Sequence, residues 1–132
     1  MLLRTETDHL AVTESRDNGA TWSEPALTDY TDCMCRHHFG RLPDGRFFGL
    51  SCPEPRSRRT PLVLAASADG VVFDRHYVLG DEPADQPRRD GIFKFGRYGY
   101  PSYCFVEGNL HVIYSVSKED ICTVRVPLDA LS

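Results

Sequence analysis

The chain has 132 residues, 41% of them hydrophobic, which is enough for one globular domain at most. Its formal net charge is −4, with 19 acidic residues against 15 lysines and arginines. This balance provides no basic face, so we expect no nucleic-acid partner. No apolar run approaches the ~18 residues of a membrane span, and residues 1–4 lack the apolar core of a signal peptide. We therefore expect no membrane partner.

Almost every predicted element is a strand. No long stretch has a helical period, and nine prolines and ten glycines are spread along the chain. Short runs of Val, Ile, Leu, Phe and Tyr recur between turn dipeptides at intervals of about 8–12 residues, which is typical of all-β proteins. The runs predict strands near 2–6, 9–15, 22–27, 36–42, 46–52, 60–67, 72–79, 99–106, 109–116 and 120–126. A charged, proline-containing loop is predicted over residues 81–92.

Between the second and third predicted strands stands the string Ser15-Arg16-Asp17-Asn18-Gly19-Ala20-Thr21-Trp22. Asp-Asn-Gly is hairpin-turn composition, with Gly19 supplying a positive φ. The Asp17 carboxylate and the Ser15 hydroxyl can cap turn amides, and Trp22 is expected to bury its ring against the turn. The string resembles an Asp-box, a turn that recurs in β-propellers of the sialidase superfamily.

A second, shortened copy of this string follows another apolar strand. Its key residues, in the places of Ser15, Asp17, Gly19 and Trp22, are Ser67, Asp69, Gly70 and Phe73. The two serines are 52 positions apart (67 minus 15), which is a propeller-blade period. The sequence therefore predicts an all-β fold in which the Asp-box turns recur once per blade.

Four strands per blade give the organisation of the whole chain, 1–132, as one partial β-propeller. It contains about two and a half four-stranded antiparallel blades: a blade remnant over 1–30, a full blade over 36–80 and a last blade over 98–127. A closed ring needs at least four blades. We therefore expect either the C-terminal part of a longer propeller or a chain that assembles with others. A small stand-alone sandwich would leave the repeat unexplained.

Three further segments extend the resemblance to the sialidase-like, or BNR-repeat, family over essentially the whole chain. They are Leu42-Pro43-Asp44-Gly45-Arg46, Arg59-Thr60-Pro61-Leu62, and the run from Gly108 to Leu128. The resemblance implies the C-terminal end of a six-bladed propeller. The last blade would lack the strand that the N-terminal region normally supplies. Open blade edges predict that the partners are the remaining blades or further copies of this chain.

Strand alternation decides which residues share an end of the sheets. Within each blade the turns between strands 2 and 3 and the inter-blade connections emerge on one face, and the Asp-box turns on the other. The first face collects Arg4, Glu6, Asp8, Arg36, His37, His38, Arg56, Arg58, Arg59, Lys94, Arg97, Tyr100, Lys118 and Glu119. Cationic and aromatic groups at one end suit an anionic sugar, because arginine offers a two-pronged donor to a carboxylate. We expect a carbohydrate ligand.

The family resemblance assigns roles to two of these residues. Arg59 matches the third arginine of the sialidase carboxylate clamp, and Tyr100 matches the nucleophilic tyrosine, with Tyr103 as second choice. Tyrosine nucleophiles are the sialidase exception among glycosidases. Arg36, His37 and Lys118 complete the candidate substrate-binding set, and His38 is a candidate acid or base. Alternatively, Arg59 forms a surface ion pair, Tyr100 packs at a strand start, and residues 118–120 form a turn with a local ion pair.

Other family positions differ in this sequence. The glutamate that activates the tyrosine is expected near residues 38–40, where none occurs, and Ser115 replaces a second glutamate. Residues 51–53 stand where the second clamp arginine is expected, with Arg56 as a loose substitute. The sequence thus predicts a sialidase-like exo-glycosidase that hydrolyses or binds an acidic or modified sugar. The alternatives are a non-catalytic propeller that binds glycan or protein, and an inactive truncated product.

The cysteines are odd in number and irregularly spaced: Cys33, Cys35, Cys52, Cys104 and Cys122. This pattern favours free thiols in a reducing compartment, which suggests a cytoplasmic location. The Cys33-Met34-Cys35 string with the histidines that follow it fits no standard zinc spacing. We therefore expect no metal and no cofactor.

Overall fold

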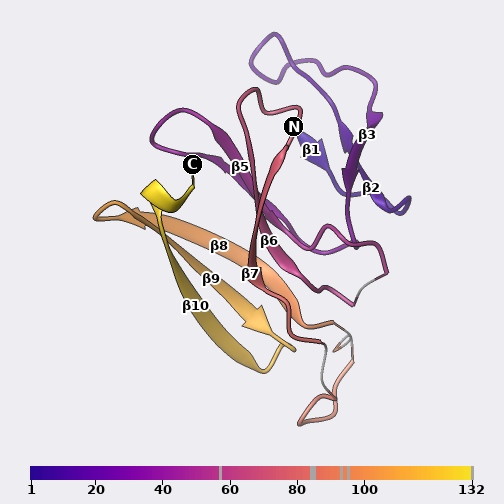
Figure 1. Cartoon of the computed structure of the whole chain (residues 1–132). Helices are drawn as coiled ribbons and strands as arrows, with labels where there is room; N and C mark the ends of the chain where they lie inside the picture. The colour runs from indigo at the N-terminus through magenta and orange to yellow at the C-terminus, as the bar shows by residue number, and fades with distance from the viewer. Residues whose placement is uncertain (57, 84–85, 93, 95, 132) are drawn as a thin grey trace.

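A computed structural model describes residues 1–56, 58–83, 86–92, 94 and 96–131. These residues form ten strands and one short 3₁₀ helix (Figure 1). The elements are β1 (Leu2–Leu3), β2 (His9–Val12), β3 (Ala26–Thr31), β4 (His38–Arg41), β5 (Phe47–Ser51), β6 (Leu62–Ser67), β7 (Arg75–Gly80), β8 (Tyr98–Val106), β9 (Asn109–Val116), β10 (Asp120–Pro127) and η1 (Leu128–Ala130). The described part of the chain contains no helix long and apolar enough to cross a membrane.

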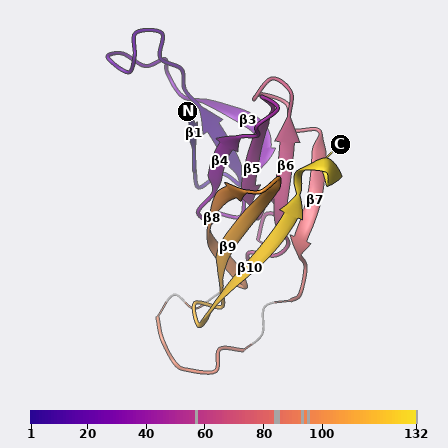
Figure 2. The same cartoon turned by 90° about the vertical axis from the view of Figure 1, so that its left-hand side faces the viewer.

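The strands form three antiparallel sheets in the order β1-β2-β3, β4-β5-β6-β7 and β10-β9-β8. Consecutive strands pair throughout each sheet, so the chain is a partial propeller-like array with a four-stranded sheet between two three-stranded ones. This confirms the predicted all-β class. Figure 2 shows both Asp-box turns at its top and the long connection from β7 to β8 at its bottom. The two ends of the sheets are therefore distinct surfaces.

Each predicted strand has a counterpart in the structure, but one strand was predicted to begin and to end four residues too early. The strand predicted over 22–27 runs over Ala26–Thr31. Ser23 still belongs to the Asp-box turn, since its N–H donates to the Glu14 carbonyl at 2.8 Å and its own carbonyl accepts the Thr13 hydroxyl at 2.7 Å. The first predicted strand, 2–6, shortens to two residues because Thr5 bends back to accept and donate hydrogen bonds within the β1–β2 turn.

The hairpin joining β4 to β5 has a tight turn set by Leu42 to Arg46. The Leu42 N–H donates to the Arg46 carbonyl at 2.7 Å, and Gly45 has a φ of +95° that favours glycine. The Arg46 guanidinium pairs with the Asp44 carboxylate at 2.7 Å. This turn fixes the strand register so that His38 lies opposite Leu50.

The main core lies between the four-stranded sheet and the C-terminal sheet. Its buried members are Leu42, Phe48, Leu50, Leu64, Ala66, Leu110, Val112 and Leu131. The Phe48 ring is fully buried and meets the Tyr103 ring at 4.8 Å between centroids, a burial worth about 1.5–3 kcal/mol. Gly40 permits this packing, because a Cβ there would collide with the Tyr103 ring.

Aromatic rings join the N-terminal sheet to the four-stranded sheet. Tyr30 of β3 packs edge-on against Phe73 at 5.2 Å and against Phe39 at 6.0 Å between ring centroids. The Tyr30 hydroxyl pairs with the Ser51 hydroxyl at 2.9 Å. Burial raises the pKa of the Tyr30 phenol to about 12. Phe73, the aromatic residue of the second Asp-box, thus helps hold two sheets together.

Candidate functional site

The first Asp-box is closed by its own polar groups. The Ser15 hydroxyl accepts the Gly19 N–H at 2.7 Å and donates to the Asp17 carboxylate at 2.9 Å. Asp17 also accepts the Thr21 N–H at 2.8 Å and the Thr21 hydroxyl at 2.6 Å. These bonds, led by those from Thr21, lower the pKa of Asp17 to about 2. The turn is thus stabilised locally, as its sequence predicts.

The prediction that Trp22 buries its ring is wrong. The indole is 49% exposed, although its Nε1–H donates to the Gly19 carbonyl at 3.2 Å and so holds the ring on the turn. The first box stands at the outer end of its sheet, and no other described segment covers the ring. Trp22 fastens this turn through its hydrogen bond.

The second Asp-box is one residue shorter than the first but forms the corresponding hydrogen bonds. The Ser67 hydroxyl accepts the Gly70 N–H at 2.9 Å and donates to Asp69 at 3.0 Å. Asp69 accepts the N–H groups of Val71 and Val72 at 2.8 and 2.9 Å, and these bonds lower its pKa. Both boxes therefore satisfy their aspartate carboxylates with groups of the same turn.

The opposite end of the sheets holds most of the left-handed backbone. Of the ten non-glycine residues with positive φ in the described chain, eight lie there and two, Asn18 and Glu107, lie at the Asp-box end. The eight are Asp8, Met34, Arg56, Arg58, Arg59, Tyr100, Ser117 and Lys118. Such conformations cost of order 1–3 kcal/mol each and gather at functional sites. The end of the sheets opposite the Asp-boxes is therefore the candidate location of a functional site.

Tyr100 occupies a bulge in β8. Its φ is +55°, and the pairing of β8 with β9 shifts register between Gly99 and Ser102. A bulge redirects a side chain away from the ladder, and the Tyr100 ring is accordingly 48% exposed. About half of the Tyr100 surface is therefore open to a ligand at the start of β8.

Four predicted site residues meet around this ring. An open groove of about 530 Å³ is lined by Arg4, Cys35, Arg36, His37 and Tyr100, together with Leu2 and Leu3. A neighbouring groove of about 310 Å³ is lined by Arg36, His37, His38, Tyr100, Pro101 and Ser102. The Lys118 ammonium lies 5.9 Å from the centroid of the Tyr100 ring, which makes a cation–π contact. We call this surface the Tyr100 groove.

The two histidines of the groove differ in their surroundings. The His38 ring packs on Tyr103 at 4.8 Å between centroids, and its Nδ1 lies 3.3 Å from the Pro101 carbonyl. His37 stacks edge-on against Phe39 at 5.0 Å. Its Nδ1 is buried with no hydrogen-bond partner among the described residues. Burial lowers the pKa of His37 below its usual value, which favours the neutral imidazole.

Arg59 lies apart from this groove. Its side chain extends along Gly96 and Gly99, whose lack of a Cβ leaves the space it occupies, and its carbonyl accepts the Tyr98 N–H at 3.1 Å. It is outside the described lining of both grooves. The structure therefore brings together Arg36, His37, His38, Tyr100 and Lys118, and it places Arg59 to one side, at the start of β8.

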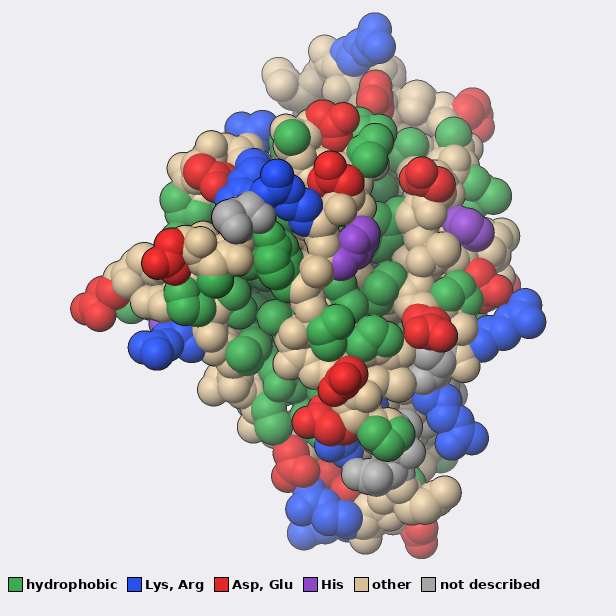
Figure 3. Space-filling view, in the orientation of Figure 1, with side chains coloured by type: hydrophobic (Ala, Val, Ile, Leu, Met, Phe, Trp, Pro, Cys, Tyr) green, Lys and Arg blue, Asp and Glu red, His purple; other side chains and the backbone are tan. Residues whose placement is uncertain are grey.

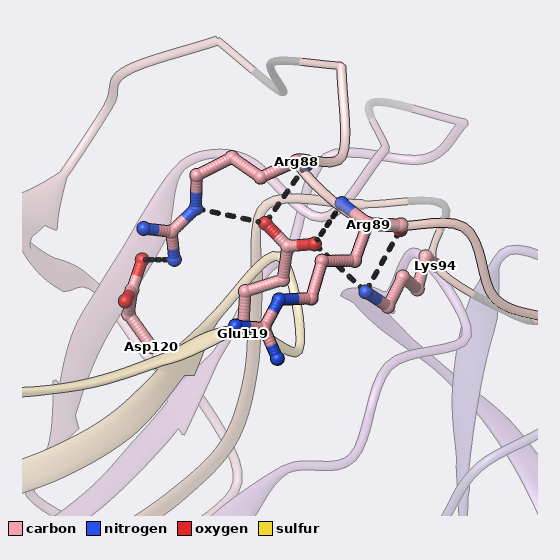
Figure 4. A network of polar contacts seen from close by, with 5 residues as sticks. All are labelled: Arg88, Arg89, Lys94, Glu119 and Asp120. Carbon is pink, nitrogen blue, oxygen red and sulfur yellow. Dashed lines mark hydrogen bonds and ion pairs between the residues drawn. The ribbon is translucent and has the colours of Figure 1, made fainter.

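Residues 118–120 were expected to form a local ion pair, but their partners are some 30 residues away. The Glu119 carboxylate accepts the N–H groups of Arg88 and Arg89 at 3.0 and 2.9 Å and the Lys94 ammonium at 2.7 Å (Figure 4). The Arg88 guanidinium also contacts Asp120 at 2.6 Å.

The Glu119 side chain is only 7% exposed. Lys94, with the backbone donors, lowers its pKa to about 2. Glu119 thus holds the connection before β8 against the β9–β10 turn, which positions the neighbouring Lys118 beside Tyr100.

Sequence reasoning missed a cluster of three sulfurs behind the Tyr100 groove. The Sγ atoms of Cys33, Cys35 and Cys52 lie within 4.8 Å of one another. The predicted β4–β5 hairpin contained a signal for this cluster. In its register His38 lies opposite Leu50, and extending that pairing by two residues places residue 52 opposite residue 36, next to Cys35. The three cysteines are therefore close in the structure although their spacing in the sequence matches no standard metal-binding pattern.

The three thiols differ in the direction in which their pKa values are shifted. Hydrogen bonds from Cys35 and then Cys52 lower the pKa of Cys33 to about 4, and the same bonds raise the pKa values of Cys35 and Cys52. Beside them, burial raises the pKa of Asp32 to about 7. Among the three thiols, ionisation is therefore favoured at Cys33, which is less buried than the other two.

Comparison with known proteins agrees with the fold and the Asp-box turns. A family model for the BNR repeat-like domain matches residues 1–112. The chain therefore belongs to the BNR repeat-like family, as the resemblance in its sequence indicated. No curated protein and no solved structure matches it significantly.

Proposed function

We propose that the Tyr100 groove binds an acidic sugar and that the chain is part of a sialidase-like, carbohydrate-active propeller. One observation carries the proposal: Arg4, Arg36 and His37 line the groove together with an exposed tyrosine ring. The arginines offer charge-assisted donors to a sugar carboxylate. The Tyr100 ring offers a flat apolar face to the sugar ring. Lys118 adds a further positive charge over the ring of Tyr100.

Hydrolysis is a second candidate, favoured by the exposed Tyr100 phenol on its strained bulge. In that reaction the phenol would lose its proton and bond to the anomeric carbon, while the glycosidic bond breaks and the aglycone oxygen leaves and takes up a proton. Water would then attack the anomeric carbon, lose a proton and return the phenol oxygen to its protonated form. The described lining of the grooves contains no carboxylate that could take the proton. Among the groups of the groove, a ring nitrogen of His37 or His38 is the available acceptor. Binding is therefore better supported than hydrolysis.

The remaining part of the proposal concerns partners. We propose that the missing blades, or further copies of this chain, cover the open edges of the first and last sheets. Figure 3 shows apolar side chains across the middle of one face. Leu27 on β3, an edge strand of the first sheet, and Ile121 on β10, an edge strand of the last sheet, are mostly exposed. Unpaired edges of this kind invite association. Light scattering over a concentration series should show oligomers; a monomer at all concentrations would contradict this part.

Binding is tested by titrating the protein with N-acetylneuraminic acid and, as a matched neutral ligand, with its methyl ester. We expect NMR shifts at groove residues with the acid and at least about tenfold weaker binding of the ester, because charged hydrogen bonds contribute about 1.5–3 kcal/mol. Arg36→Gln should weaken binding of the acid by a similar factor. Arg16→Gln, on the first Asp-box, is the control. Equal affinity for acid and ester would overturn the proposal.

Hydrolysis is tested separately with an aryl sialoside and a neutral aryl glycoside. Tyr100→Phe keeps the ring but removes the nucleophilic oxygen, so it should abolish any hydrolysis while retaining binding. Tyr100→Ala should weaken both. If the wild-type chain releases no aryl group yet binds the acid, the site is a binding site and the catalytic candidate is wrong.

A further inference from the structure

We propose that Cys33, Cys35 and Cys52 form a three-thiolate site for a thiophilic divalent ion of the zinc type, located behind the Tyr100 groove. The proposal is independent of the sugar-binding function. It rests on the convergence of three sulfurs from two connections that are distant in sequence. Cys33 and Cys35 lie between β3 and β4, and Cys52 directly follows β5.

Backbone contacts fix these two connections against each other. The Cys33 N–H donates to the Cys52 carbonyl at 3.2 Å. In return, the Cys52 N–H donates to the Cys35 Sγ at 3.3 Å. An amide N–H directed at sulfur stabilises a thiolate, the form that binds metal. The sulfurs are therefore held together by main-chain bonds that do not depend on the metal.

The spacing suits one ion. With Zn–S bonds of about 2.3 Å, sulfurs in a tetrahedral site lie about 3.8 Å apart. The three Sγ atoms already lie within 4.8 Å of one another, so side-chain rotations that bring them closer by about 1 Å or less complete the geometry. Three protein ligands leave the fourth position to a solvent molecule, as in zinc sites with an open position.

The surroundings favour a soft ion over a hard one. Cys35 and Cys52 are each 1% exposed and belong to an apolar cluster with Leu62, Tyr98 and Val116. Cys33 is only half-buried, which gives the ion its access. Thiolate donors select zinc-like and copper(I)-like ions, whereas magnesium and calcium prefer oxygen.

Charge selects between a divalent and a monovalent ion. Three thiolates leave a net charge of −1 with a divalent ion but −2 with a monovalent one, before the Asp32 carboxyl group, 3.8 Å from the Cys35 Sγ, is counted. An ionised Asp32 would add the same charge in both cases, and a larger uncompensated charge is costlier in an apolar site. Arg4 lies close by, with its guanidinium 3.3 Å from the Met34 carbonyl between the two cysteines. A divalent ion is therefore the better match. Bound there, it would tie the β3–β4 connection, which carries Arg36 and His37, to the start of the β5–β6 connection.

Cd²⁺ is a suitable probe, because its thiolate bonds absorb in the near ultraviolet. The reduced full chain should bind one equivalent with this absorption, and Zn²⁺ should displace it. Cys33→Ser should weaken Cd²⁺ binding by at least about tenfold, the lower range seen when support of a metal site is lost. Cys104→Ser, at an exposed thiol of β8, should bind like the wild type. Absence of the absorption in the wild type, or equal binding by the two variants, would overturn the site.

A second measurement remains decisive if Cys33→Ser does not fold. Alkylation of the native wild-type chain, followed by peptide mapping, gives the reaction rate of each thiol. Saturating Zn²⁺ should slow alkylation of Cys33 at least about tenfold while Cys104 reacts at an unchanged rate. If Cys33 reacts equally fast with and without Zn²⁺, the three thiols pack together without a metal and the proposal is wrong.

Discussion

The two ends of the sheets are organised differently. At the Asp-box end, the two box aspartates are held by groups within four residues of them: Asp17 by Thr21, and Asp69 by Val71 and Val72. At the groove end the important contacts join distant segments: Glu119 to Arg88, and Cys33 to Cys52. One end is therefore built from local turns that repeat, and the other from connections that are unique to each blade. The comparison shows why the repeat identifies the fold and leaves the site undefined.

Backbone strain follows the same division. The groove end has eight of the ten non-glycine residues with positive φ in the described chain. The left-handed positions of the Asp-box turns are Gly19 and Gly70, with Asn18 as the one non-glycine residue among them in the described chain. Strained residues persist when the position of a side chain matters more than stability. We therefore expect substitutions at the two ends to affect stability and binding differently.

The largest effect on stability is expected at the second Asp-box. Ser67→Ala removes a hydroxyl that bonds both the Gly70 N–H and the Asp69 carboxylate, on a residue that is 1% exposed. The free energy of unfolding should fall by about 1–3 kcal/mol, measured by urea titration. Ser15→Ala, in the exposed first box, should cost less, because water can replace the lost bonds. Equal losses would show that burial does not distinguish the boxes.

A smaller, local effect is expected from Glu119→Gln. The neutral amide loses the ion pairs with Arg88 and Lys94, so the connection before β8 should open more often. Hydrogen exchange at the amides of Arg88 and Arg89 should accelerate several-fold. Glu107→Gln, on the β8–β9 turn at the other end, should leave those two rates unchanged. Unaltered exchange in Glu119→Gln would contradict the role of Glu119 in holding this connection.

A matched pair of glycine substitutions tests whether the strain at the groove end is functional. Lys118 and Glu107 have φ values of +54° and +48°. Glycine relieves this strain but has a more flexible unfolded state, so each substitution should raise stability by a net of about 0.5–1 kcal/mol. Only Lys118→Gly should also weaken binding of the acidic sugar. If Glu107→Gly weakens binding of the acidic sugar equally, the expected difference between the two ends is contradicted.

Acid and salt should distinguish the carboxylates of the two ends. The pKa values of Asp17 and Glu119 are both lowered to about 2. Folded-state pKa values below the unfolded ones mean that each group stabilises the fold above pH ~4 and loses this contribution as the pH falls towards 2. Asp17 is held by hydroxyl and amide groups alone, whereas Glu119 is held by two backbone amides and by the cations of Lys94 and Arg88. Added salt should therefore raise only the pKa of Glu119, as measured by carboxyl NMR titration. Equal salt responses would contradict this division.

Much of the fold could be predicted because its signals are local. The turn at Leu42–Arg46, the two Asp-boxes and the alternating strands each depend on residues within a few positions, so all ten strands and their pairing order followed from the sequence. The errors occurred where the effect was not local. Trp22 was expected to be buried, but burial depends on what covers a ring. The strand expected over 22–27 begins later because Ser23 bonds back to residues 13 and 14.

The candidate site was predictable only in part. Strand alternation correctly assigned Arg36, His37, His38, Tyr100 and Lys118 to one end of the sheets, because turn order alone decides it. It also assigned Arg59 there, but whether Arg59 enters the groove depends on the space above Gly96 and Gly99. The bulge that exposes Tyr100 depends on register within β8 and β9. No local pattern encodes either outcome.

The sequence by itself determined the all-β class, the blade repeat and the family, since these depend on short-range turn chemistry and alternation. Only the tertiary structure decided which side chains meet. The β4–β5 register brings Cys52 to Cys33 and Cys35, and the return of the β7–β8 connection brings Arg88 to Glu119. Contacts between segments 17 to 31 residues apart depend on how strands pair and how connections fold back over the sheets. The physical reason is that these positions are set by packing of the whole chain.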